Sequence, residues 1–575
     1  MAPPLTPADS AAGPQTRSRR AAPRLGLRAS ASIGLIAAVL CAACASQNAS
    51  RAADGKAAPE AAPAISFSDP KRLERLSARL EENAGPLLDG WLKKSRSPGL
   101  AFGVVADGKL IYFRGLGARE WTSKAKVDLD TAFRIASMTK SFIGLAALQL
   151  RDQGKLSLDE PAEKYLPELK GLRYPTADSP KMTVRHLLSH AAGLPEDNPS
   201  ADLRMPMTDA EFEAVLKRGL SFSAAPGTQF EYSNLAFALA GRLVQRVSGV
   251  RFQDLVTEQI LKPLGMTSTV WSAAALPADR RSPGYGRKGA PTPGAGLARH
   301  DQDDEPHEEP DIADGTWAAI GGLWTTPRDY AHYVAFQLQA WPPRDGAEEG
   351  PVRRASVRES HEVQRSAHFR AGLRDGKVRV RSSGYGLGWG VAESCEIDRI
   401  ITHTGGLPGY GSVVRLLPDQ NVGLFAFANL TYSAPTSLTQ DIEDDLRRAG
   451  LLPARPAAAS AQLIAARDAV FALYEKWDAA AAAPLFDRTF TYYKPLEKLR
   501  AELAGLVARH GRCRLEDLVP ENFLRGVNRL SCDRGSVEMT LTLTSEAPPL
   551  VQSLGFESWV PGDPPKPPPP GRCAQ

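Results

Sequence analysis

Residues 142–150 form a continuous run, FIGLAALQL, in which only the glutamine is polar. A helix built from such a run has no polar face to turn toward water, so it must be buried inside a domain. Ser137 and Lys140 stand just before the run, and on a helix their spacing places the hydroxyl and the amine on one face. The start of a helix also offers unpaired backbone N–H groups. A serine there has a neighbouring proton acceptor and donors for an oxyanion, which favours acyl transfer.

The Ser-x-x-Lys spacing occurs three times in the chain, so its surroundings decide which copy carries chemistry. The copy at Ser68 precedes a proline and a leucine-rich run, which predicts that Ser68 caps the start of a helix. The copy at Ser123 lies in a polar stretch typical of an exposed loop. Only the copy at Ser137 leads into a helix that must be buried, so Ser137 is the candidate nucleophile.

The length of the chain, 575 residues, predicts two domains with additional segments. Hydrophobic residues make up 43% of it and charged residues 23%, as in soluble globular proteins. The 70 basic and 65 acidic residues leave a formal net charge of only +5. Composition therefore gives no sign of a nucleic-acid partner.

The N-terminal region has the pattern of an export signal. Arginines between residues 17 and 28 precede an apolar core from Ile33 to Leu40, and small residues follow up to Ala45. This core is too short to span a membrane. Two outcomes stay open: cleavage after Ala45, or lipidation of Cys44, whose surroundings resemble a bacterial lipoprotein signal. We expect an exported bacterial protein, either periplasmic or anchored to a membrane as a lipoprotein.

Changes in composition divide the chain into six segments. They are a signal peptide (1–45), a linker (46–66), a main domain (67–452), a second linker (453–462), a small C-terminal domain (463–560) and a proline-rich tail (561–575).

The main domain is predicted to have strands at both of its ends. Two strands flank the hairpin turn Asp107-Gly108, and later strands are expected in the stretches 384–390, 400–404, 412–416 and 422–427. The region between them is largely helical. This order predicts an α+β fold, in which helices flank an antiparallel sheet whose first and last parts pair. A helix is also expected over residues 70–94, and Pro86 should kink or break it.

The C-terminal domain is predicted to be a small α+β unit that resembles a cystatin-like or nuclear-transport-factor-like cone. A helix should carry the apolar face around Phe471 and Tyr474, and strands are expected over 489–493 and 537–543. Cys513 and Cys532 both lie in this segment. In an exported protein they favour a disulfide, with two buried thiols as the alternative.

Two further groups of residues can carry chemistry. Tyr232 and Asn234 form the only Tyr-x-Asn in the chain, on a predicted loop that enters a helix. The stretch His403-Thr404-Gly405-Gly406 closes one strand and leads toward the next, and its glycines let another backbone approach closely. Each group alone is equally consistent with a structural role, as a helix start or as a glycine-rich hairpin.

With these residues the chain resembles the serine β-lactamase and penicillin-binding protein superfamily, in its class C and DD-peptidase-like branch. The three signatures of that family, Ser-x-x-Lys, Tyr-x-Asn and Lys- or His-Thr-Gly, stand in order at Ser137, Tyr232 and His403. The resemblance covers roughly residues 70–450. It implies an antiparallel sheet flanked by helices, with an all-helical insert. Supporting segments lie at 133–136, 183–194, 321–326 and 385–389.

The resemblance also implies a role for each residue. Ser137 attacks a carbonyl and becomes acylated, and Lys140 and Tyr232 share the proton transfers, each lowering the pKa of the other. Tyr232 is expected to be the general base or proton relay. The backbone N–H groups of Ser137 and Gly406 form the oxyanion hole. The remaining positions bind substrate, and they are Asn234, His403, Thr404 and Gly405.

The third signature bears on the substrate. Many β-lactamases have lysine where this chain has His403, and a histidine is largely neutral at pH 7. The resemblance is therefore as consistent with a D-alanyl-D-alanine peptidase or an esterase as with a β-lactamase. Substrates would be a peptidoglycan stem peptide, a β-lactam, an amide or an ester, with no cofactor. A different alternative is a non-catalytic protein that binds penicillin or peptidoglycan, or senses it, in the same cleft.

Two histidine groups raise the question of a metal. His186 and His190 have the spacing of a zinc-binding helix but lack its glutamate, so we interpret them as packing residues. His300 and His307 lie in an acidic stretch that is typical of an exposed loop. We expect no metal site.

Overall fold

The structure, a computed structural model, describes residues 67–561 except 288–304, 375–376, 395 and 456–457. Its largest element is a nine-stranded antiparallel sheet with the order β3-β2-β1-β13-β12-β11-β10-β9-β8. The strands are β1 (Gly99–Ala106), β2 (Lys109–Glu120), β3 (Ala125–Lys126), β8 (Arg365–Arg374), β9 (Lys377–Tyr385), β10 (Gly390–Ser394), β11 (Ile400–Leu407), β12 (Tyr410–Leu417) and β13 (Val422–Ala428). The predicted pairing of first and last strands is confirmed, since Leu100 of β1 lies opposite Ala428 of β13.

The turn between β1 and β2 is the one expected from the sequence. Asp107 has a φ of 48° and Gly108 a φ of 76°, so both residues adopt the left-handed conformation of a two-residue hairpin turn.

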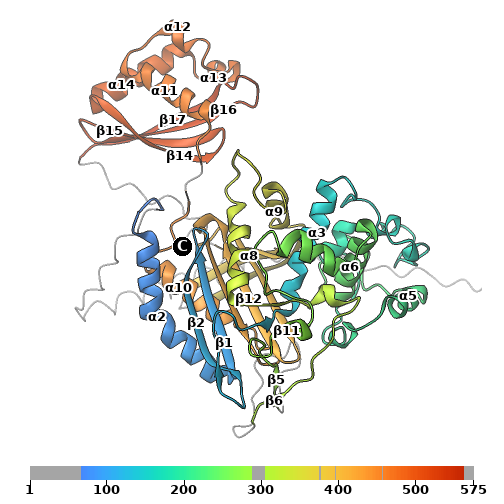
Figure 1. The fold of residues 1–575 in the computed structure, drawn as a ribbon. Coiled ribbons are helices and arrows are strands. Elements are labelled where there is room, and N and C mark those ends of the chain that lie inside the picture. The colour runs from blue at the N-terminus through green and yellow to red at the C-terminus, as the bar shows by residue number, and fades with distance from the viewer. Residues whose placement is uncertain (1–66, 288–304, 375–376, 395, 456–457, 562–575) are drawn as a thin grey trace, which may run out of the picture. The chain divides into compact units, whose positions relative to one another are not determined.

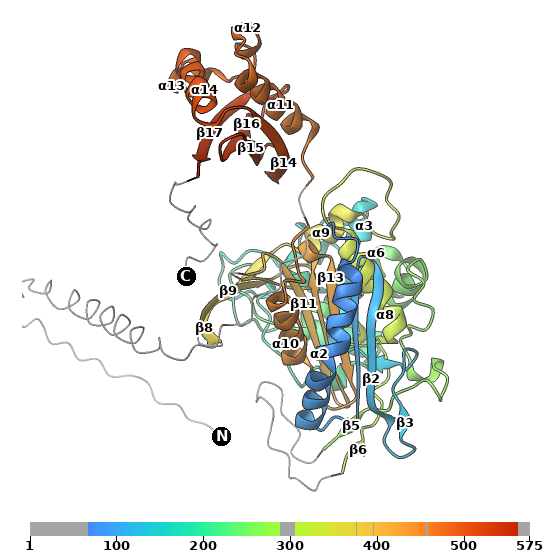
Figure 2. The same cartoon turned by 90° about the vertical axis from the view of Figure 1, so that its left-hand side faces the viewer.

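Both faces of the sheet are covered by helices (Figures 1 and 2). Residues of β13 alternate between two cores: Leu424 and Ala426 pack on one side, and Phe425 and Phe427 on the other. Helices α2 (Arg72–Ser95) and α10 (Thr436–Arg448) cover the first side, whereas α8 (Pro327–Gln339) covers the second. All residues of β13 are buried, as expected of a central strand.

The remaining elements of the main part lie mostly between β3 and β8 in sequence. The α-helices are α3 (Thr139–Asp152), α4 (Val184–Leu188), α5 (Asp209–Lys217), α6 (Asn234–Ser248), α7 (Phe252–Val256) and α9 (Arg354–Ser360). Short strand pairs join β4 (Phe133–Arg134) to β7 (Trp324–Thr325) and β5 (Tyr285–Gly286) to β6 (His307–Glu308). Single turns of helix are η1 (Ala136–Met138), η2 (Ala162–Lys164), η3 (Pro167–Leu169), η4 (Asp202–Arg204), η5 (Thr257–Leu261), η6 (Ala273–Ala275), η7 (Ala318–Ile320) and η8 (Pro418–Gln420).

Three local predictions are wrong. Helix α2 continues through Pro86, so the break expected as one of two outcomes does not occur, because that residue is exposed and the leucines of the opposite face hold the helix on the sheet. Ser68 does not cap α2, which begins at Arg72 after Lys71. The stretch 384–390 is not one strand, since β9 ends at Tyr385 and β10 begins at Gly390.

The C-terminal residues form a separate hydrophobic core under a four-stranded antiparallel sheet. Every second residue of β16, from Val537 to Leu543, is buried in that core. Its helices are α11 (Ala461–Glu475), α12 (Ala479–Ala482), α13 (Arg488–Tyr493) and α14 (Leu496–His510), and its strands are β14 (Cys513–Asn522), β15 (Arg525–Cys532), β16 (Ser536–Leu543) and β17 (Val551–Trp559). The α+β fold class is thereby confirmed.

Two expectations about this C-terminal part can be compared with the structure. Residues 489–493 belong to helix α13 and not to a strand, because the Asp487 side chain caps the helix by accepting a hydrogen bond from the Thr489 N–H. Cys513 and Cys532 form a disulfide that joins β14 to β15. The proposed boundaries of the domains stay predictions.

Candidate active site

Ser137 lies on η1, the turn that leads directly into α3. The preceding residue, Ala136, has a φ of 50°, in the left-handed region that residues other than glycine rarely adopt. Every residue of α3 from Thr139 to Leu148 is buried. The predicted burial of this helix is confirmed, and Ser137 is therefore held by a rigid central element.

Lys140 lies one turn after Ser137 and has no exposed surface. Its Nζ is 2.9 Å from Ser137 Oγ, 2.8 Å from Asn234 Oδ1 and 2.8 Å from the Ile320 carbonyl oxygen. Burial lowers the pKa of Lys140 to about 7, although the nearby carboxylate of Asp197 acts in the opposite direction. A substantial fraction of this lysine is therefore a neutral amine at pH 7, which can accept a proton.

Tyr232 precedes α6 and shares a hydrogen bond with the Ser137 side chain. The Lys140 Nζ lies 5.1 Å from the centre of its ring. Burial raises the pKa of Tyr232 above its ordinary value. The expectation that the tyrosine pKa is lowered is wrong: around neutral pH its hydroxyl keeps its proton and can donate it.

Asn234 is the first residue of α6 and is fixed by three side chains. Its Oδ1 accepts the Lys140 hydrogen bond, and its Nδ2 donates to Asp197 Oδ1 at 3.1 Å and to Asn198 Oδ1 at 2.7 Å. Asp197 also accepts the backbone N–H groups of Asn234 at 2.8 Å and Leu235 at 2.9 Å, so it caps α6 from a distant segment. Sequence analysis missed Asp197, because no local pattern reveals a cap 37 residues away.

His403 lies buried on β11 between two hydrogen-bond partners. Its Nε2 is 2.7 Å from the Tyr385 hydroxyl, and its Nδ1 is 2.6 Å from the Thr404 carbonyl oxygen. The carbonyl can only accept, so Nδ1 carries the proton and Nε2 accepts from Tyr385. Burial lowers the pKa of His403 to about 3, with a smaller contribution from the Lys140 charge. The ring is therefore neutral at physiological pH.

Gly405 lets β11 lie against the turn that carries Ser137, and Gly406 lets it lie against Tyr432. A Cβ on Gly405 would lie 2.3 Å from the Ile135 carbonyl oxygen, and one on Gly406 would lie 2.5 Å from Cδ1 of Tyr432. No side chain fits at either position. Among the described residues, the pairing of β10 with β11 ends at Thr402, so the edge of β11 beyond it offers its backbone groups to a ligand.

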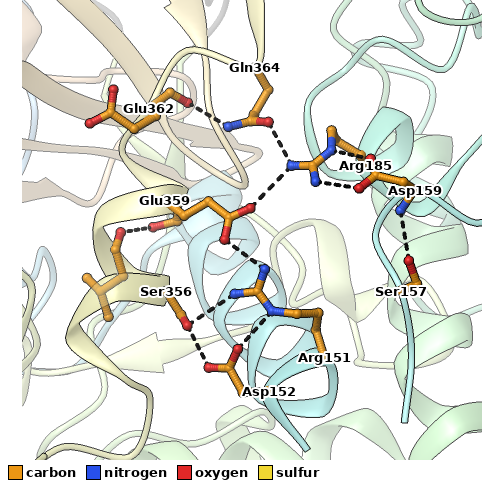
Figure 3. Close-up of polar contacts among 11 residues, drawn as sticks. Arg151, Asp152, Ser157, Asp159, Arg185, Ser356, Glu359, Glu362 and Gln364 are labelled. Carbon is orange, nitrogen blue, oxygen red and sulfur yellow. Dashed lines mark hydrogen bonds and ion pairs between the residues drawn. The ribbon is translucent and has the colours of Figure 1, made fainter. Parts of the chain in front are cut away.

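The far end of α3 is anchored by a network of charged groups (Figure 3). Arg151 Nη1 lies 2.7 Å from Glu359 Oε2 on α9, and Ser356 Oγ lies 2.6 Å from Asp152 Oδ2. Arg185 of α4 joins this network through Glu359 at 3.3 Å and through its bidentate pair with Asp159. The helix is thus fixed at its C-terminal end as well as by its burial.

The two histidines with zinc-like spacing accept hydrogen bonds from backbone N–H groups. Nδ1 of His186 accepts a hydrogen bond from the Thr183 N–H within a capping box, and Nδ1 of His190 accepts from the Ser233 N–H at 3.0 Å. The His190 ring also lies 4.1 Å from the Tyr232 ring. Both are packing residues, as interpreted from the sequence. Within the described part of the chain, no three His, Cys, Asp or Glu residues gather closely enough to hold a metal ion.

Several predicted features fall outside the described residues. They include the export signal, Ala45, Cys44 and His300. His307, in contrast, is described and lies exposed on β6. The helices of the described segments include none with both the length and the apolar character needed to cross a membrane.

A family model described as Beta-lactamase matches residues 78–447. Protein flp of Staphylococcus aureus (strain COL) is 26% identical over 374 residues, which is 65% of this chain and 68% of that protein. The D-alanyl-D-alanine-carboxypeptidase/endopeptidase AmpH of Escherichia coli (strain K12) is 29% identical over 337 residues, or 58% of this chain and 79% of that protein. The octameric penicillin-binding protein homologue from Pyrococcus abyssi has a similar fold, with a TM-score of 0.53, 18% identity, and coverage of 84% of this chain and 96% of that one.

Proposed function

Because the chain belongs to the beta-lactamase family, we propose that it is a serine hydrolase that forms an acyl-enzyme on Ser137. The observation that carries the proposal is the 2.9 Å contact between Lys140 Nζ and Ser137 Oγ. A buried amine with a pKa of about 7 is matched to proton transfer near neutral pH. A nucleophile and base in contact, with the base oriented by a third group such as Asn234, support nucleophilic catalysis.

Acylation begins when the neutral Lys140 amine takes the Ser137 proton and Oγ attacks the carbonyl carbon. The backbone N–H groups of Ser137 and Gly406 stabilise the oxyanion of the tetrahedral intermediate, and each such donor contributes roughly 10²–10³ in rate. The Tyr232 hydroxyl then gives its proton to the leaving group and recovers one from the Lys140 ammonium. A water molecule, activated by the same lysine and tyrosine, hydrolyses the acyl-enzyme and restores Ser137.

The neutral ring of His403 bears on the substrate. It supplies no fixed positive charge at the position where the family often has a lysine, so nothing at His403 requires a carboxylate on the substrate. We propose ester, amide or D-alanyl-D-alanine-type peptide bonds as the substrates. The peptidase named among the relatives supports the peptide class.

Turnover of p-nitrophenyl esters, D-amino acid amides, acyl-D-Ala-D-Ala peptides and a chromogenic cephalosporin tests the proposal. We expect at least one of these classes to be hydrolysed, and Ser137→Ala to lose about 10³-fold or more in kcat/KM while its thermal midpoint stays near that of the wild type. Tight binding of penicillin or peptidoglycan fragments without any acyl transfer would instead identify a non-catalytic binding protein.

We also propose export, on the basis of the pattern in residues 17–45. Mass spectrometry of the mature N-terminus from a bacterial host distinguishes cleavage after Ala45 from lipidation of Cys44. An unprocessed N-terminus in the cytoplasmic fraction would contradict export.

A further inference from the structure

His190 follows the short helix α4 and lies beside the loop that carries Tyr232. Its φ is 53°, in the left-handed region, and the residue is only 1% exposed. Helix α4 is itself anchored, because Arg185 pairs with Asp159 and Glu359 (Figure 3). His190 therefore stands at a fixed point next to the proposed proton donor.

The backbone on both sides of Tyr232 is hydrogen-bonded to His190. The Glu231 N–H donates to the His190 carbonyl oxygen at 2.9 Å, and the Ser233 N–H donates to His190 Nδ1 at 3.0 Å. The centre of the His190 ring lies 4.1 Å from the centre of the Tyr232 ring. One histidine thus holds the residues before and after Tyr232 and packs on the side chain between them.

These contacts also define which nitrogen of His190 carries the proton. Nδ1 accepts the Ser233 N–H, so the proton of the neutral ring stands on Nε2. The rings of Phe230 and Tyr385 lie around the imidazole, with their centres 6.0 and 4.5 Å away. Burial lowers the pKa of His190 well below its ordinary value, and the charge of Lys140 acts in the same direction. The imidazole is therefore neutral around pH 7 and keeps Nδ1 as an acceptor.

The position of the Tyr232 hydroxyl matters most for substrates with a basic leaving group. In the proposed mechanism Tyr232 gives its proton to the leaving oxygen or nitrogen as the bond to the carbonyl carbon breaks, and it recovers a proton from the Lys140 ammonium. An alkoxide or an amide anion is too basic to leave without that proton, whereas p-nitrophenolate departs as a stable anion. Such proton donation contributes roughly 10²–10⁴ in rate and requires hydrogen-bond reach. A displaced Tyr232 would therefore slow alkyl esters and amides selectively.

We propose that His190 is a positioning residue, which holds Tyr232 where its hydroxyl can protonate the leaving group. The inference rests on the proposed function and extends it from the reacting groups to a residue packed behind one of them. A residue that only stabilised the fold would change the rates of all substrates alike. The loss of the His190 contacts should instead change how the rate depends on the leaving group.

Three compounds with one acyl group that the wild type accepts test the proposal. They are its p-nitrophenyl ester, its ethyl ester and its amide with D-alanine. The readout is the ratio of kcat/KM for the p-nitrophenyl ester to kcat/KM for each of the other two, so a general loss of activity cancels.

Three substitutions separate the contacts of His190. In His190→Asn the side-chain oxygen takes the place of Nδ1 and still accepts the Ser233 N–H, whereas His190→Gln places its amide only where Nε2 stands. His190→Leu offers no acceptor at all. We expect the ratios to rise by about tenfold or more in His190→Leu and His190→Gln, and to stay within about threefold of the wild type in His190→Asn.

Two controls accompany these variants. Tyr232→Phe removes the hydroxyl and should raise the same ratios, and adding His190→Leu to it should change them no further, because His190 acts through that hydroxyl. His186→Ala loses a comparable hydrogen bond, the one from the Thr183 N–H in the capping box of α4, and should leave the ratios unchanged.

Several results would overturn this inference while leaving the proposed function intact. They are ratios unchanged in His190→Gln and His190→Leu, a rise in His190→Asn as large as in His190→Gln, a further rise on adding His190→Leu to Tyr232→Phe, or a wild type that hydrolyses only the p-nitrophenyl ester. If His190→Leu does not fold, the comparison of His190→Asn with His190→Gln decides alone. A wild type that hydrolyses no ester, amide or peptide overturns the proposed function and this inference with it.

Discussion

The Nζ atom of Lys140 lies 2.9 Å from the Oγ atom of Ser137, with no exposed surface on the lysine. The Asn234 side chain and the Ile320 carbonyl oxygen hold the amine from two other directions. Nucleophile and base are therefore positioned by one turn of a buried helix and need no movement to meet.

This arrangement predicts the pH dependence of activity. Below pH 7 the Lys140 amine is protonated and cannot accept the serine proton, because its pKa is lowered only to about 7. We expect kcat/KM to rise tenfold per pH unit up to about 7 and then to stay level, since Tyr232 has a raised pKa and remains protonated. A pH profile from 5 to 10 on an uncharged ester measures this. Activity that falls between pH 7 and 9 would contradict the assignment of Lys140 as the base.

Removing the distant cap of α6 should affect both stability and activity. In Asp197→Ala the N–H groups of Asn234 and Leu235 lose their acceptor, which should cost about 1–2 kcal/mol of unfolding free energy. The Asn234 amide also loses a partner, so we expect kcat/KM to fall by about tenfold. Urea denaturation and ester kinetics measure the two effects.

Thr208→Ala is a matched control for this prediction. Thr208 caps α5 within its own capping box, so its loss should cost similar stability. An equal loss of activity in Thr208→Ala and Asp197→Ala would show that the effect of Asp197 is only structural.

The close contacts around the glycines of β11 predict that a larger residue there is destabilising. In Gly405→Ala the new methyl group would meet the Ile135 carbonyl oxygen at 2.3 Å, next to the turn that carries Ser137. We expect about 1–3 kcal/mol of destabilisation and a loss of about 10² or more in kcat/KM. Gly90→Ala is the control, because that position on α2 has nothing within 4 Å, and it should gain roughly 0.5–1 kcal/mol. Wild-type activity in Gly405→Ala would contradict the close approach of β11 to Ser137.

The disulfide between Cys513 and Cys532 closes a loop of 19 residues in sequence. Replacing both cysteines by alanine should lower the unfolding free energy of the C-terminal core by about 3 kcal/mol, mainly through the entropy of the unfolded chain. Hydrogen exchange of β14–β17 in the variant and the wild type measures this. Unchanged protection of these strands would contradict a stabilising role for the bond.

Sequence patterns predicted the elements that depend on local chemistry. The buried helix after Ser137 follows from an apolar run with no polar face, and the β1–β2 turn follows from Asp107-Gly108. Pro86 does not break α2, because Pro86 lies on the exposed face of the helix and the packing of the opposite face stabilises it.

The parts of the site that could not be predicted depend on contacts distant in sequence. Asp197 looks like an ordinary loop residue until the fold brings it to α6. The raised pKa of Tyr232 likewise reflects burial, which a motif does not encode.

Labelling of the full chain with a fluorophosphonate, followed by intact mass and peptide mapping, tests the central claim most directly. We expect one adduct per chain, located on Ser137, and its absence in Ser137→Ala. The rate of labelling should fall by about 10²–10⁴ in Lys140→Met, which removes the base. An adduct on another residue, or equal labelling of Ser137→Ala, would contradict the account of Ser137 as a nucleophile activated by Lys140.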